Sequence, residues 1–583
     1  MAGAPRSSDT PASGQEIRRP RLQAMDVTTL RALLAAMRAR WLPSRFEKAQ
    51  QWDGTTIQLG LRSLQGMEWL ELSWQAEAPR LLSIEAPVRR GDGSTLAQQL
   101  QHGLRGLALV SLEQEGWERV VRFGFARRPG APTERTLVLE LMGRHSNLFL
   151  LDGDGRIAAL GRQVKERQSR WRPIGNGDPY PSPPPLSGLP PSLAEPRDRW
   201  QARLSLVPLP LEAALRDCYQ GISPALMGQL LAGDPWARTP VDQLQPEQWD
   251  RLWQQWQAWL RSVETGAFGW QLEADGERYR CWPAAGELPG DRLADLTGLG
   301  AGLSRYYQQH LQARQLAQHR LRLHHRLEAA IAREQRLIRD QEILLARSDQ
   351  SPLLQQQADA LLCLASPSRD QVDEAQKLYR QARRLRRSGL AIIPRLEQHR
   401  QTLVWLEALH TFVDQADSLE QLQDLEEEGE ELSGDRRPRH RVQRRAPARS
   451  EPCPLELQSG SGLRLQVGRN HRQNDWISLR QARRGDLWFH AQECPGSHVV
   501  LKSSEGLATE ADLQLAADLA AYFSRARGNR RVAVVMVPTS DLQRIAGATA
   551  GAVRHRGGQV LWGEPERALP LATATSLRGD SGS

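Results

Sequence analysis

Two long helical segments joined by a short turn constrain the fold of this 583-residue chain more than any other feature. Residues 300–346 contain no glycine or proline after Gly302, and an apolar seam at heptad-like spacing follows the segment. A second seam follows a turn near 366–368, at spacings of three and four residues. Two such seams predict an antiparallel coiled-coil hairpin over residues 300–425. The seam residues are Leu327, Ile331, Ile338, Leu345, Ala375, Leu378, Ala382 and Leu385.

The charge of the chain is basic, and most of it comes from arginine. The net charge is +9, and only four of the 77 basic residues are lysine. This excess of arginine over lysine favours phosphate binding, because the guanidinium group binds phosphate oxygens in a bidentate manner. A GC-rich genome would produce the same excess. Residues 301–347 carry nine Arg against four acidic residues, and residues 373–410 carry eight Lys and Arg against four. The two arms therefore predict either a solvated surface or one that contacts RNA.

The segment before the hairpin predicts a mixed α/β domain over residues 25–180. A helix is expected over 25–40, and five later segments have the length and alternation of strands. A proline-rich run at 179–185 breaks the chain and marks the end of the domain. The expected strands are 56–61, 68–74, 80–84, 119–125 and 137–141.

Residues 186–290 predict a helical domain. The sequence GISP at 221–224 precedes an apolar run and is typical of a helix-hairpin-helix turn, whose backbone amides can face a phosphate, or of a simple capped pair of helices. Residues 451–570 predict a second mixed α/β domain. The predicted fold class is therefore a multidomain α+β protein with a coiled-coil hairpin between its domains.

Three segments are expected to stay outside these domains. Residues 1–24 are polar and predict a disordered tail, or a start misassigned upstream of Met25. Residues 424–431 hold six acidic residues and 436–449 hold seven Arg, so this block is not expected to pack. It predicts a charged linker over 426–450, either a plain connection or an arm that binds RNA. Residues 571–583 predict a disordered tail.

Several classes of protein are disfavoured by what the sequence lacks. The five cysteines are scattered, which disfavours a zinc site or a disulfide framework. No apolar run is long enough for a membrane span and no signal peptide is apparent, so a cytoplasmic protein is expected. No nucleotide-binding or hydrolase motif occurs, which predicts a protein that is not an enzyme and uses no cofactor. A DNA-lesion lyase would need an N-terminal proline and usually four zinc-binding cysteines.

The most informative stretch for function is 462–502, which mixes glycines, amides, tryptophans and histidines between short apolar runs. It contains GRNHRQNDW (468–476), GDLWFH (485–490) and PGSHVV (495–500). Such a mixture predicts a sheet whose loops present donors and acceptors to a ligand. In this order the three motifs resemble the C-terminal RNA-binding domain of the NFACT family, ribosome quality-control factors once named fibronectin-binding proteins.

This resemblance implies a set of residues that bind RNA or the ribosome. Trp476 and Trp488 are of the type that stacks on unpaired bases, and Arg469 and Arg472 of the type that holds phosphate. Alternatively, the tryptophans belong to the core and His490 and His498 bond internally. A metal site at these histidines is not expected, because no carboxylates or cysteines stand at ligand spacing from them. The implied residues are Arg469, Asn470, Arg472, Gln473, Asn474, Asp475, Asp486, Trp488, His490, Gly496, Ser497 and His498.

The resemblance extends over nearly the whole chain and implies a tRNA site in the first domain. ELMGRHSNLFLLD (140–152) is similar to a family motif; alone, it indicates a strand, a polar turn and a strand. Glu118–Arg119 stands where the family has an Asp-Arg pair implicated in tRNA binding, with an exposed ion pair as the alternative. The segment between Ser83 and Leu107 is shorter than in the family. The implied tRNA-binding residues are Glu118, Arg119, Arg45, Glu140, Arg144, Ser146 and Asn147.

The function that the resemblance implies is ribosome-associated quality control in bacteria. Such a factor binds large ribosomal subunits blocked by peptidyl-tRNA and recruits alanyl-tRNA. It supports template-free addition of a C-terminal alanine tail, with peptidyl transfer left to the ribosome. Glu118 and the shortened segment leave open a ribosome or RNA binder without tailing. A surface protein that binds fibronectin is a further alternative.

Overall fold

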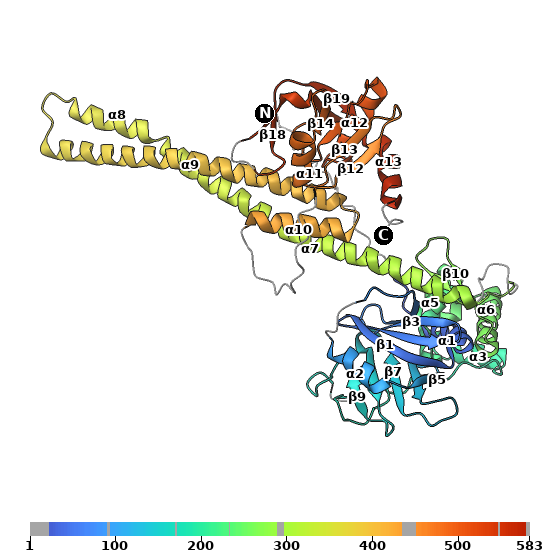
Figure 1. Ribbon diagram of the computed structural model, residues 1–583. Coiled ribbons are helices and arrows are strands. Elements are labelled where there is room, and N and C mark those ends of the chain that lie inside the picture. The colour runs from blue at the N-terminus through green and yellow to red at the C-terminus, as the bar shows by residue number, and fades with distance from the viewer. Residues whose placement is uncertain are drawn as a thin grey trace. The chain divides into compact units, whose positions relative to one another are not determined.

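The computed structural model describes residues 22–89, 94–169, 172–231, 234–287, 296–433, 451–545 and 549–578. The chain divides into two compact units, Met1–Ala313 and Arg314–Ser583 (Figure 1). Helices and antiparallel sheets occur in both, so the predicted multidomain α+β fold class is confirmed. The domain boundaries drawn from the sequence stay predictions. No helix among the described residues is both long and apolar enough to cross a membrane.

The first unit contains a nine-stranded antiparallel sheet in the order β4-β3-β2-β1-β5-β6-β7-β8-β9. Strands expected at 56–61, 68–74, 80–84, 119–125 and 137–141 are confirmed as β2, β3, β4, β6 and β7. Helices α1 (Val27–Trp41) and α2 (Thr95–Leu104) bury their apolar faces in the same core as the sheet. The strands are β1 Ser44–Asp53, β2 Thr56–Ser63, β3 Gly66–Ser73, β4 Arg80–Ile84, β5 Ala108–Gln114, β6 Val120–Ala126, β7 Arg135–Glu140, β8 Asn147–Leu151 and β9 Ile157–Leu160.

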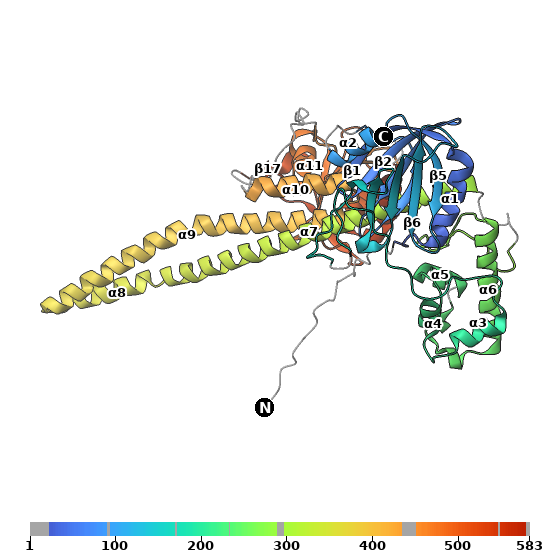
Figure 2. The same ribbon diagram turned by 90° about the horizontal axis from the view of Figure 1, so that it is seen from below.

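Four helices of the first unit pack around a core rich in tryptophan, and Figure 2 shows them gathered into one group. Their bounds are α3 Arg197–Leu204, α4 Leu211–Cys218, α5 Pro224–Leu230 and α6 Pro246–Thr265. The GISP turn lies between α4 and α5, where Ser223 caps α5 by accepting the Leu226 N–H at 2.9 Å. The same Ser223 hydroxyl bonds the Asp26 carboxylate at 2.8 Å, which joins this turn to the start of α1. A small hairpin, β10 (Gln271–Leu272) and β11 (Tyr279–Arg280), follows.

The end of the predicted N-terminal tail packs at the core of the nine-stranded sheet, which corrects the prediction of a tail over 1–24. The Gln23 side chain exchanges hydrogen bonds with the backbone of Tyr279 at 3.0 and 3.1 Å, and its carbonyl accepts the Tyr307 hydroxyl at 2.9 Å. These buried bonds satisfy an amide and a backbone carbonyl that would otherwise be costly to bury. Residues 1–21 lie outside the described residues.

The predicted coiled-coil hairpin is present. Helix α7 (Leu296–Ser348) begins in the first unit and continues in the second. There α8 (Ser351–Leu362) runs on in the same direction, and α9 (Arg369–Gln415) returns alongside it (Figure 1). The turn at 363–368 includes the expected serine and proline residues, and Ser368 caps α9. All eight predicted seam residues are buried or half-buried, which confirms the seams.

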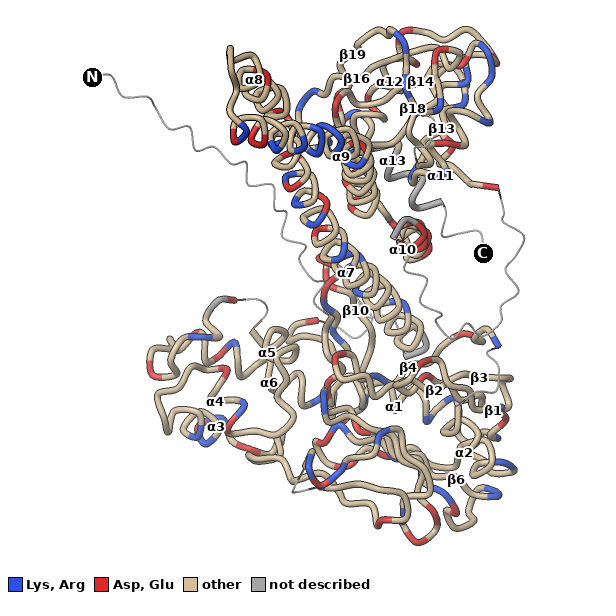
Figure 3. The backbone as a smooth tube through the Cα atoms, turned by 90° about the vertical axis from the view of Figure 1, so that its left-hand side faces the viewer, with Lys and Arg blue, Asp and Glu red and all other residues tan. Residues whose placement is uncertain are grey.

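Helix α10 (Leu419–Ser433) corrects the prediction that the acidic block 424–431 cannot pack. It buries Leu422 and Leu425 in the core that it shares with α9, and Glu428 is also buried. The other acidic residues of the helix, which Figure 3 shows in red, are exposed or half-buried. The sequence argument counted the charges and overlooked the three-residue spacing of these leucines. The arginine-rich part of the predicted linker, 434–450, lies outside the described residues.

The second unit also contains a six-stranded antiparallel sheet in the order β12-β13-β15-β14-β16-β19. Helix α12 (Glu510–Tyr522) covers one face with an alanine- and leucine-rich core. A short helix α11 (His471–Asp475), a π-helical turn η4 (Trp476–Arg480) and the hairpin β17 (Leu542–Arg544)–β18 (Val553–His555) lie on the other face. The strands of the sheet are β12 Leu455–Gln458, β13 Arg464–Val467, β14 Leu487–Ala491, β15 Val499–Leu501, β16 Val532–Pro538 and β19 Gln559–Gly563.

Helix α13 (Pro565–Arg578) corrects the prediction that the chain is disordered after 571. Ala568 of this helix is fully buried in the core beneath α12. Alanine favours helix where one face can pack, which accounts for the helix at this place. Residues 579–583 lie outside the described residues.

Candidate functional sites

The turn that carries Glu118 and Arg119 joins β5 to β6 at one end of the nine-stranded sheet. Its backbone is held on both sides: the Gln114 side chain donates to the Glu118 carbonyl at 2.6 Å, and the Leu141 N–H donates to the Arg119 carbonyl at 2.9 Å. Glu140, the last residue of β7, pairs with the first residue of β6. The predicted residues from 118–119 and from 140–147 therefore lie at the same end of the sheet.

Glu118 and Arg119 do not form the exposed ion pair that was the alternative interpretation. Both side chains are half-buried, and neither makes an ion pair with any residue that the structure describes. Burial raises the pKa of the Glu118 carboxyl above its usual value, and this outweighs the lowering by the Leu186 backbone N–H and by Arg119. A half-buried acid beside an arginine without an acidic partner is an arrangement suited to binding a polar ligand.

Glu140 is fully buried, and its carboxylate is occupied. Arg172 donates to both oxygens, at 2.9 Å on Oε2, and the Tyr180 hydroxyl donates to Oε1 at 2.6 Å. Arg172 also bonds the Pro181 carbonyl at 2.9 Å, so these contacts hold the segment 172–181 against β7. Direct contact of Glu140 with tRNA stays a prediction, and its visible contacts are internal.

The turn between β7 and β8 exposes one predicted residue and buries two. Ser146 accepts the Met142 N–H at 2.8 Å, and Asn147 bonds the backbone of Arg162 as donor and acceptor at 2.7 and 2.8 Å. Arg144 is exposed at the tip of the turn. Ser146 and Asn147 thus shape the turn, and Arg144 is the member of this segment that a ligand can reach.

Two arginines beside the Glu118 turn were missed by the sequence argument. Arg31 of α1 donates to the Gly116 carbonyl at 2.7 Å, and its guanidinium lies 4.2 Å from the ring centre of Trp117. Arg122 of β6 lies 5.2 Å from the ring centre of Tyr180. Because Arg31 and Gly116 are 85 residues apart, no local pattern could have joined them.

Arg45 is the predicted tRNA-binding residue that the structure places apart from the others. It pairs with Ala108 at the start of β5, whereas the Glu118 turn follows the end of β5. Arg45 is exposed and forms an ion pair with Glu47 at 2.5 Å. An open hollow of about 680 Å³ lies at the same end of β5, and its lining includes Arg105, Arg127 and Arg135.

In the second unit the first and third predicted motifs fit each other closely. The Asn474 carboxamide oxygen accepts the His498 N–H at 3.0 Å, and the Gly468 N–H donates to the His498 carbonyl at 3.0 Å. A Cβ on Gly468 would lie 2.2 Å from that Asn474 oxygen, so only glycine fits there. The motif residues Gly468, Asn474 and His498 therefore form the framework of this part of the domain.

The first motif (468–476) is also stabilised by hydrogen bonds among its own residues. Asn470 caps α11 by accepting the Gln473 N–H at 2.8 Å, and the Gln473 side chain accepts the Arg469 N–H at 2.8 Å. Asp475 is buried and forms an ion pair with Arg544 at 2.5 Å. These side chains fix the course of residues 469–475, and their binding of RNA stays a prediction.

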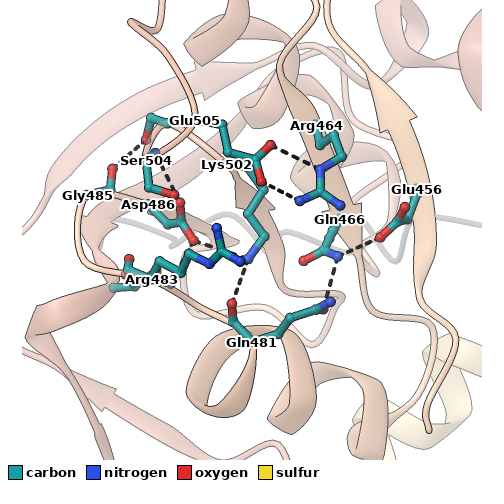
Figure 4. A network of polar contacts seen from close by, with 12 residues as sticks. Glu456, Arg464, Gln466, Gln481, Arg483, Gly485, Asp486, Lys502, Ser504 and Glu505 are labelled. Atoms are coloured by element: carbon teal, nitrogen blue, oxygen red, sulfur yellow. Dashed lines mark hydrogen bonds and ion pairs between the residues drawn. The ribbon is translucent and has the colours of Figure 1, made fainter.

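Asp486 is the centre of a buried polar network (Figure 4). Its carboxylate accepts the Lys502 ammonium at 3.1 Å and the backbone N–H groups of Arg483 and Ser504 at 2.8 and 3.1 Å. Lys502 also donates to the Gln481 carbonyl at 3.0 Å. Both charged side chains are almost fully buried, so the pair anchors the loop 481–486 to the interior of the domain.

Trp488, His490 and His498 share one face of the sheet. Trp488 and His498 are buried, and the ring of Trp488 is stacked on His490 with centroids 5.5 Å apart. The Ser478 hydroxyl lies 2.8 Å from His498 Nδ1. Burial lowers the pKa of His490 to about 4 and that of His498 further below its usual value, so both rings are neutral at pH 7. Trp488 and His498 therefore follow the alternative interpretation, in which these side chains belong to the core, whereas His490 is half-buried.

Gly496 and Ser497 pack against the end of α12. The Ser497 N–H donates to the Phe523 carbonyl at 2.8 Å, and a Cβ on Gly496 would lie 2.9 Å from that same oxygen. Among the described residues, the buried Ser497 hydroxyl and the Trp488 indole N–H have no hydrogen-bond partner. No group of metal-ligating residues occurs in the described part of the chain, which includes these histidines.

The predicted phosphate-binding arginines are engaged with acidic residues. Arg469 pairs with Asp417 at 2.8 Å, and Arg472 pairs with Glu431 at 2.5 Å. Phosphate would have to compete with these carboxylates. Three exposed arginines at the end of η4 and in the loop that follows it have no such competitor among the described residues. Sequence reasoning passed over them, although the run RQARR is visible at 480–484. These residues are Arg480, Arg483 and Arg484.

Comparison with known proteins matches almost the whole chain to one family. Residues 26–370 and 365–445 match the NFACT N-terminal and middle domains, and residues 457–557 match the NFACT protein RNA binding domain. A protein of Streptococcus suis named Rqc2 homolog RqcH is 25% identical over 562 residues, which cover 91% of this chain and 96% of that protein. The protein of the same name from Bacillus subtilis is 24% identical and covers 80% of this chain and 85% of its own length.

Solved structures of related proteins cover one part of the chain each. The C-terminal part of the fibronectin/fibrinogen-binding protein from Streptococcus suis is 29% identical, with a TM-score of 0.37, and covers 43% of this chain and 95% of that one. The N-terminal part of the same protein is 21% identical, with a TM-score of 0.38, and covers 49% of this chain and 99% of that one.

Proposed function

Because the chain belongs to the NFACT family, we propose that it is a ribosome-associated quality-control factor. In this proposal it binds large ribosomal subunits that carry peptidyl-tRNA and recruits alanyl-tRNA. It thereby promotes template-free alanine tailing of the stalled chain, which marks that chain for degradation. One observation carries the proposal. The chain contains both an NFACT RNA-binding domain and a turn whose backbone hydrogen bonds fix the positions of Glu118 and Arg119.

The Glu118 turn supplies the chemistry that tRNA binding needs. Arg119 offers a guanidinium that no described acid occupies, and such a group bonds phosphate or a base edge in a bidentate manner. Glu118 is an acceptor for a base amino group, and its longer side chain still starts from a backbone held on both sides. Arg31 adds positive charge beside the turn, where it donates to the Gly116 carbonyl, whereas Arg122 is paired with Glu115 at 3.4 Å.

The second unit supplies a separate RNA contact in this proposal. The hairpin arms carry a net excess of basic residues, and the loop 480–484 exposes three arginines. Such groups bind phosphates with little regard to sequence, which suits a surface that docks on ribosomal RNA. The chain would then act by binding and positioning, and the ribosome would carry out peptidyl transfer.

The test is to purify the tagged protein from cells at moderate salt and to sequence the RNA that accompanies it. Large-subunit rRNA together with enriched alanine tRNA is the expected result. In Arg119→Ala the tRNA should fall to background while the rRNA remains. Arg128→Ala is the matched control, since Arg128 is exposed and lies at the opposite end of β6. Absence of rRNA and tRNA would contradict the proposal.

The two alternatives give different results. A ribosome binder without tailing would bring down large-subunit rRNA with no preferred tRNA, and stalled chains would have the same C-termini with and without the gene, as read by mass spectrometry. Glu118 in place of the family's Asp motivates this alternative. A fibronectin-binding surface protein would be found at the cell exterior by fractionation and would carry no RNA.

A further inference from the structure

One face of the six-stranded sheet is covered by η4 and β17 at its centre but is exposed to solvent at the edge strand β19. The register places Val560 of β19 opposite Val535, and Trp562 opposite Ala533. Cross-strand partners share a face, and Val535 belongs to the cluster that contains Trp488. Val560 and Trp562 therefore lie on the face that carries the predicted RNA-binding residues, opposite the face covered by α12.

Exposure changes sharply along this face. Trp488 at the centre is 2% exposed because η4 and β17 pack over it. At the edge strand, Val560 is 47% and Trp562 is 55% exposed. A wide apolar side chain on an edge strand invites unwanted association, and proteins usually place charged residues there. An exposed tryptophan at this place indicates a surface that a partner covers.

The segment that leads into the patch is positively charged. No acidic residue occurs between Asp541 and Glu564 in the sequence. Arg554 and Arg556, in β18 and the turn that leads to β19, are exposed and form no ion pair with any described residue. This segment thus carries two guanidinium groups that no described carboxylate pairs with. Glu564, just beyond Trp562, is itself paired with Arg531 and Arg567 at 3.3 and 3.1 Å. The surroundings therefore favour a partner with negative charge.

We propose that Trp562 and Val560 form a platform on which an unpaired base of single-stranded RNA stacks, while Arg554 and Arg556 hold its phosphates. This inference rests on the proposed function and names one place where the RNA-binding domain contacts RNA. The indole ring offers the flat apolar face that a base needs, and arginines beside it meet the backbone. Bases within a duplex are already stacked on one another, so the platform selects single-stranded segments.

The experiment measures binding of the full-length chain to two fluorescein-labelled probes, a 12-nucleotide single-stranded RNA of mixed sequence and the same RNA as a duplex. Trp562→Ala should weaken binding of the single strand about 10-fold and leave the duplex unchanged. Trp562→Phe keeps an aromatic face and should remain within about 3-fold of the original. Leu507→Ala is the matched control, because Leu507 is 97% exposed in the same domain but is not part of the sheet.

The arginines are tested by salt dependence. In Arg554→Ala/Arg556→Ala the slope of log K against log salt for the single strand should fall by about 1.4, since each phosphate contact on single-stranded nucleic acid contributes about 0.7. An unchanged slope would contradict the placement of phosphate at these residues.

Three results would overturn the platform. Trp562→Ala could bind the single strand with the same affinity as Leu507→Ala, or it could lose affinity for both probes equally. It could also change the oligomeric state in analytical ultracentrifugation, which would show that a second copy of the chain covers the patch. Sedimentation with large ribosomal subunits separates this failure from that of the proposed function. If the unaltered chain sediments with the subunits and Trp562→Ala leaves RNA binding intact, the platform alone is wrong.

Discussion

The Lys502 ammonium lies 3.1 Å from the Asp486 carboxylate, and these side chains are 3% and 0% exposed. Removing one partner of a buried ion pair leaves the other charge uncompensated in a poorly hydrated site. Asp486 was predicted from the sequence as an RNA-binding residue, and its visible role is to hold the loop that exposes Arg483 and Arg484. The pair therefore links the fold of the domain to the surface it offers.

Lys502→Met should destabilise the domain by about 3 kcal/mol, because Asp486 would keep its charge without a cation. The expected readout is faster hydrogen–deuterium exchange of residues 481–504 in the full-length protein. Lys377→Met is the matched control: Lys377 forms an exposed pair with Glu374 at 3.3 Å and should cost less than about 0.5 kcal/mol. Equal exchange in the two variants would mean that the buried pair contributes nothing to the fold.

Glu428 predicts a pH dependence at the contact between α10 and α11. Its carboxylate accepts the N–H groups of His471 and Arg472 at 3.3 and 3.0 Å, yet burial raises the pKa of Glu428 to about 7. A carboxyl whose pKa is raised in the folded state stabilises the fold below its unfolded pKa, near 4.5, and loses that contribution as the pH rises through about 7. The contact should therefore weaken between pH 5 and pH 8.

The size of this effect is on the order of 3 kcal/mol for the full change in protonation. Hydrogen exchange of residues 468–476, corrected for the intrinsic rate at each pH, should show less protection at pH 8 than at pH 5. Glu428→Gln should remove most of this difference, while Glu427→Gln, on the exposed side of α10, should keep it. A pH difference that persists unchanged in Glu428→Gln would exclude Glu428 as its source.

Much of the fold could be predicted from patterns within single segments. The seams of α7 and α9 follow from the spacing of Leu327, Ile331, Ala375 and Ala382, because helical geometry alone places such residues on one side. The strand–turn–strand at 140–152 likewise followed from alternation and from Gly143, whose φ of 57° suits the turn. The acidic helix α10 was missed because its two leucines pack only when α9 is beside them.

The candidate sites were harder to predict, because motifs show which residues matter and not which of them are exposed. Asn474, Asp486 and His498 belong to the motif and are buried, where they bond one another or the backbone. Arg31 and Trp562 lie outside every motif, and they became visible only through the packing of α1 and the register of β19. Distant contacts of this kind leave no local trace in the sequence.

Glu140→Gln distinguishes a structural role of Glu140 from a direct tRNA contact. The change leaves Arg172 without its carboxylate in a mostly buried site, so the first unit should lose about 2–4 kcal/mol of stability. Urea unfolding followed by tryptophan fluorescence measures this loss. Glu134→Gln is the matched control, since Glu134 pairs with the exposed Arg127 at 2.9 Å and should change little. Full stability with weaker tRNA binding would instead assign Glu140 to the ligand.

Gly468→Ala tests whether the framework of the RNA-binding motif depends on the close approach of Gly468 and Asn474. The new Cβ would lie 2.2 Å from the Asn474 oxygen and 2.8 Å from its backbone nitrogen, so the motif must shift. We expect a loss of at least about 2 kcal/mol and weaker binding to large ribosomal subunits in sedimentation. Gly460→Ala is the matched control, because a Cβ there would meet nothing within 4 Å. If both variants bind alike, the tight fit at Gly468 is not what holds the binding surface in shape.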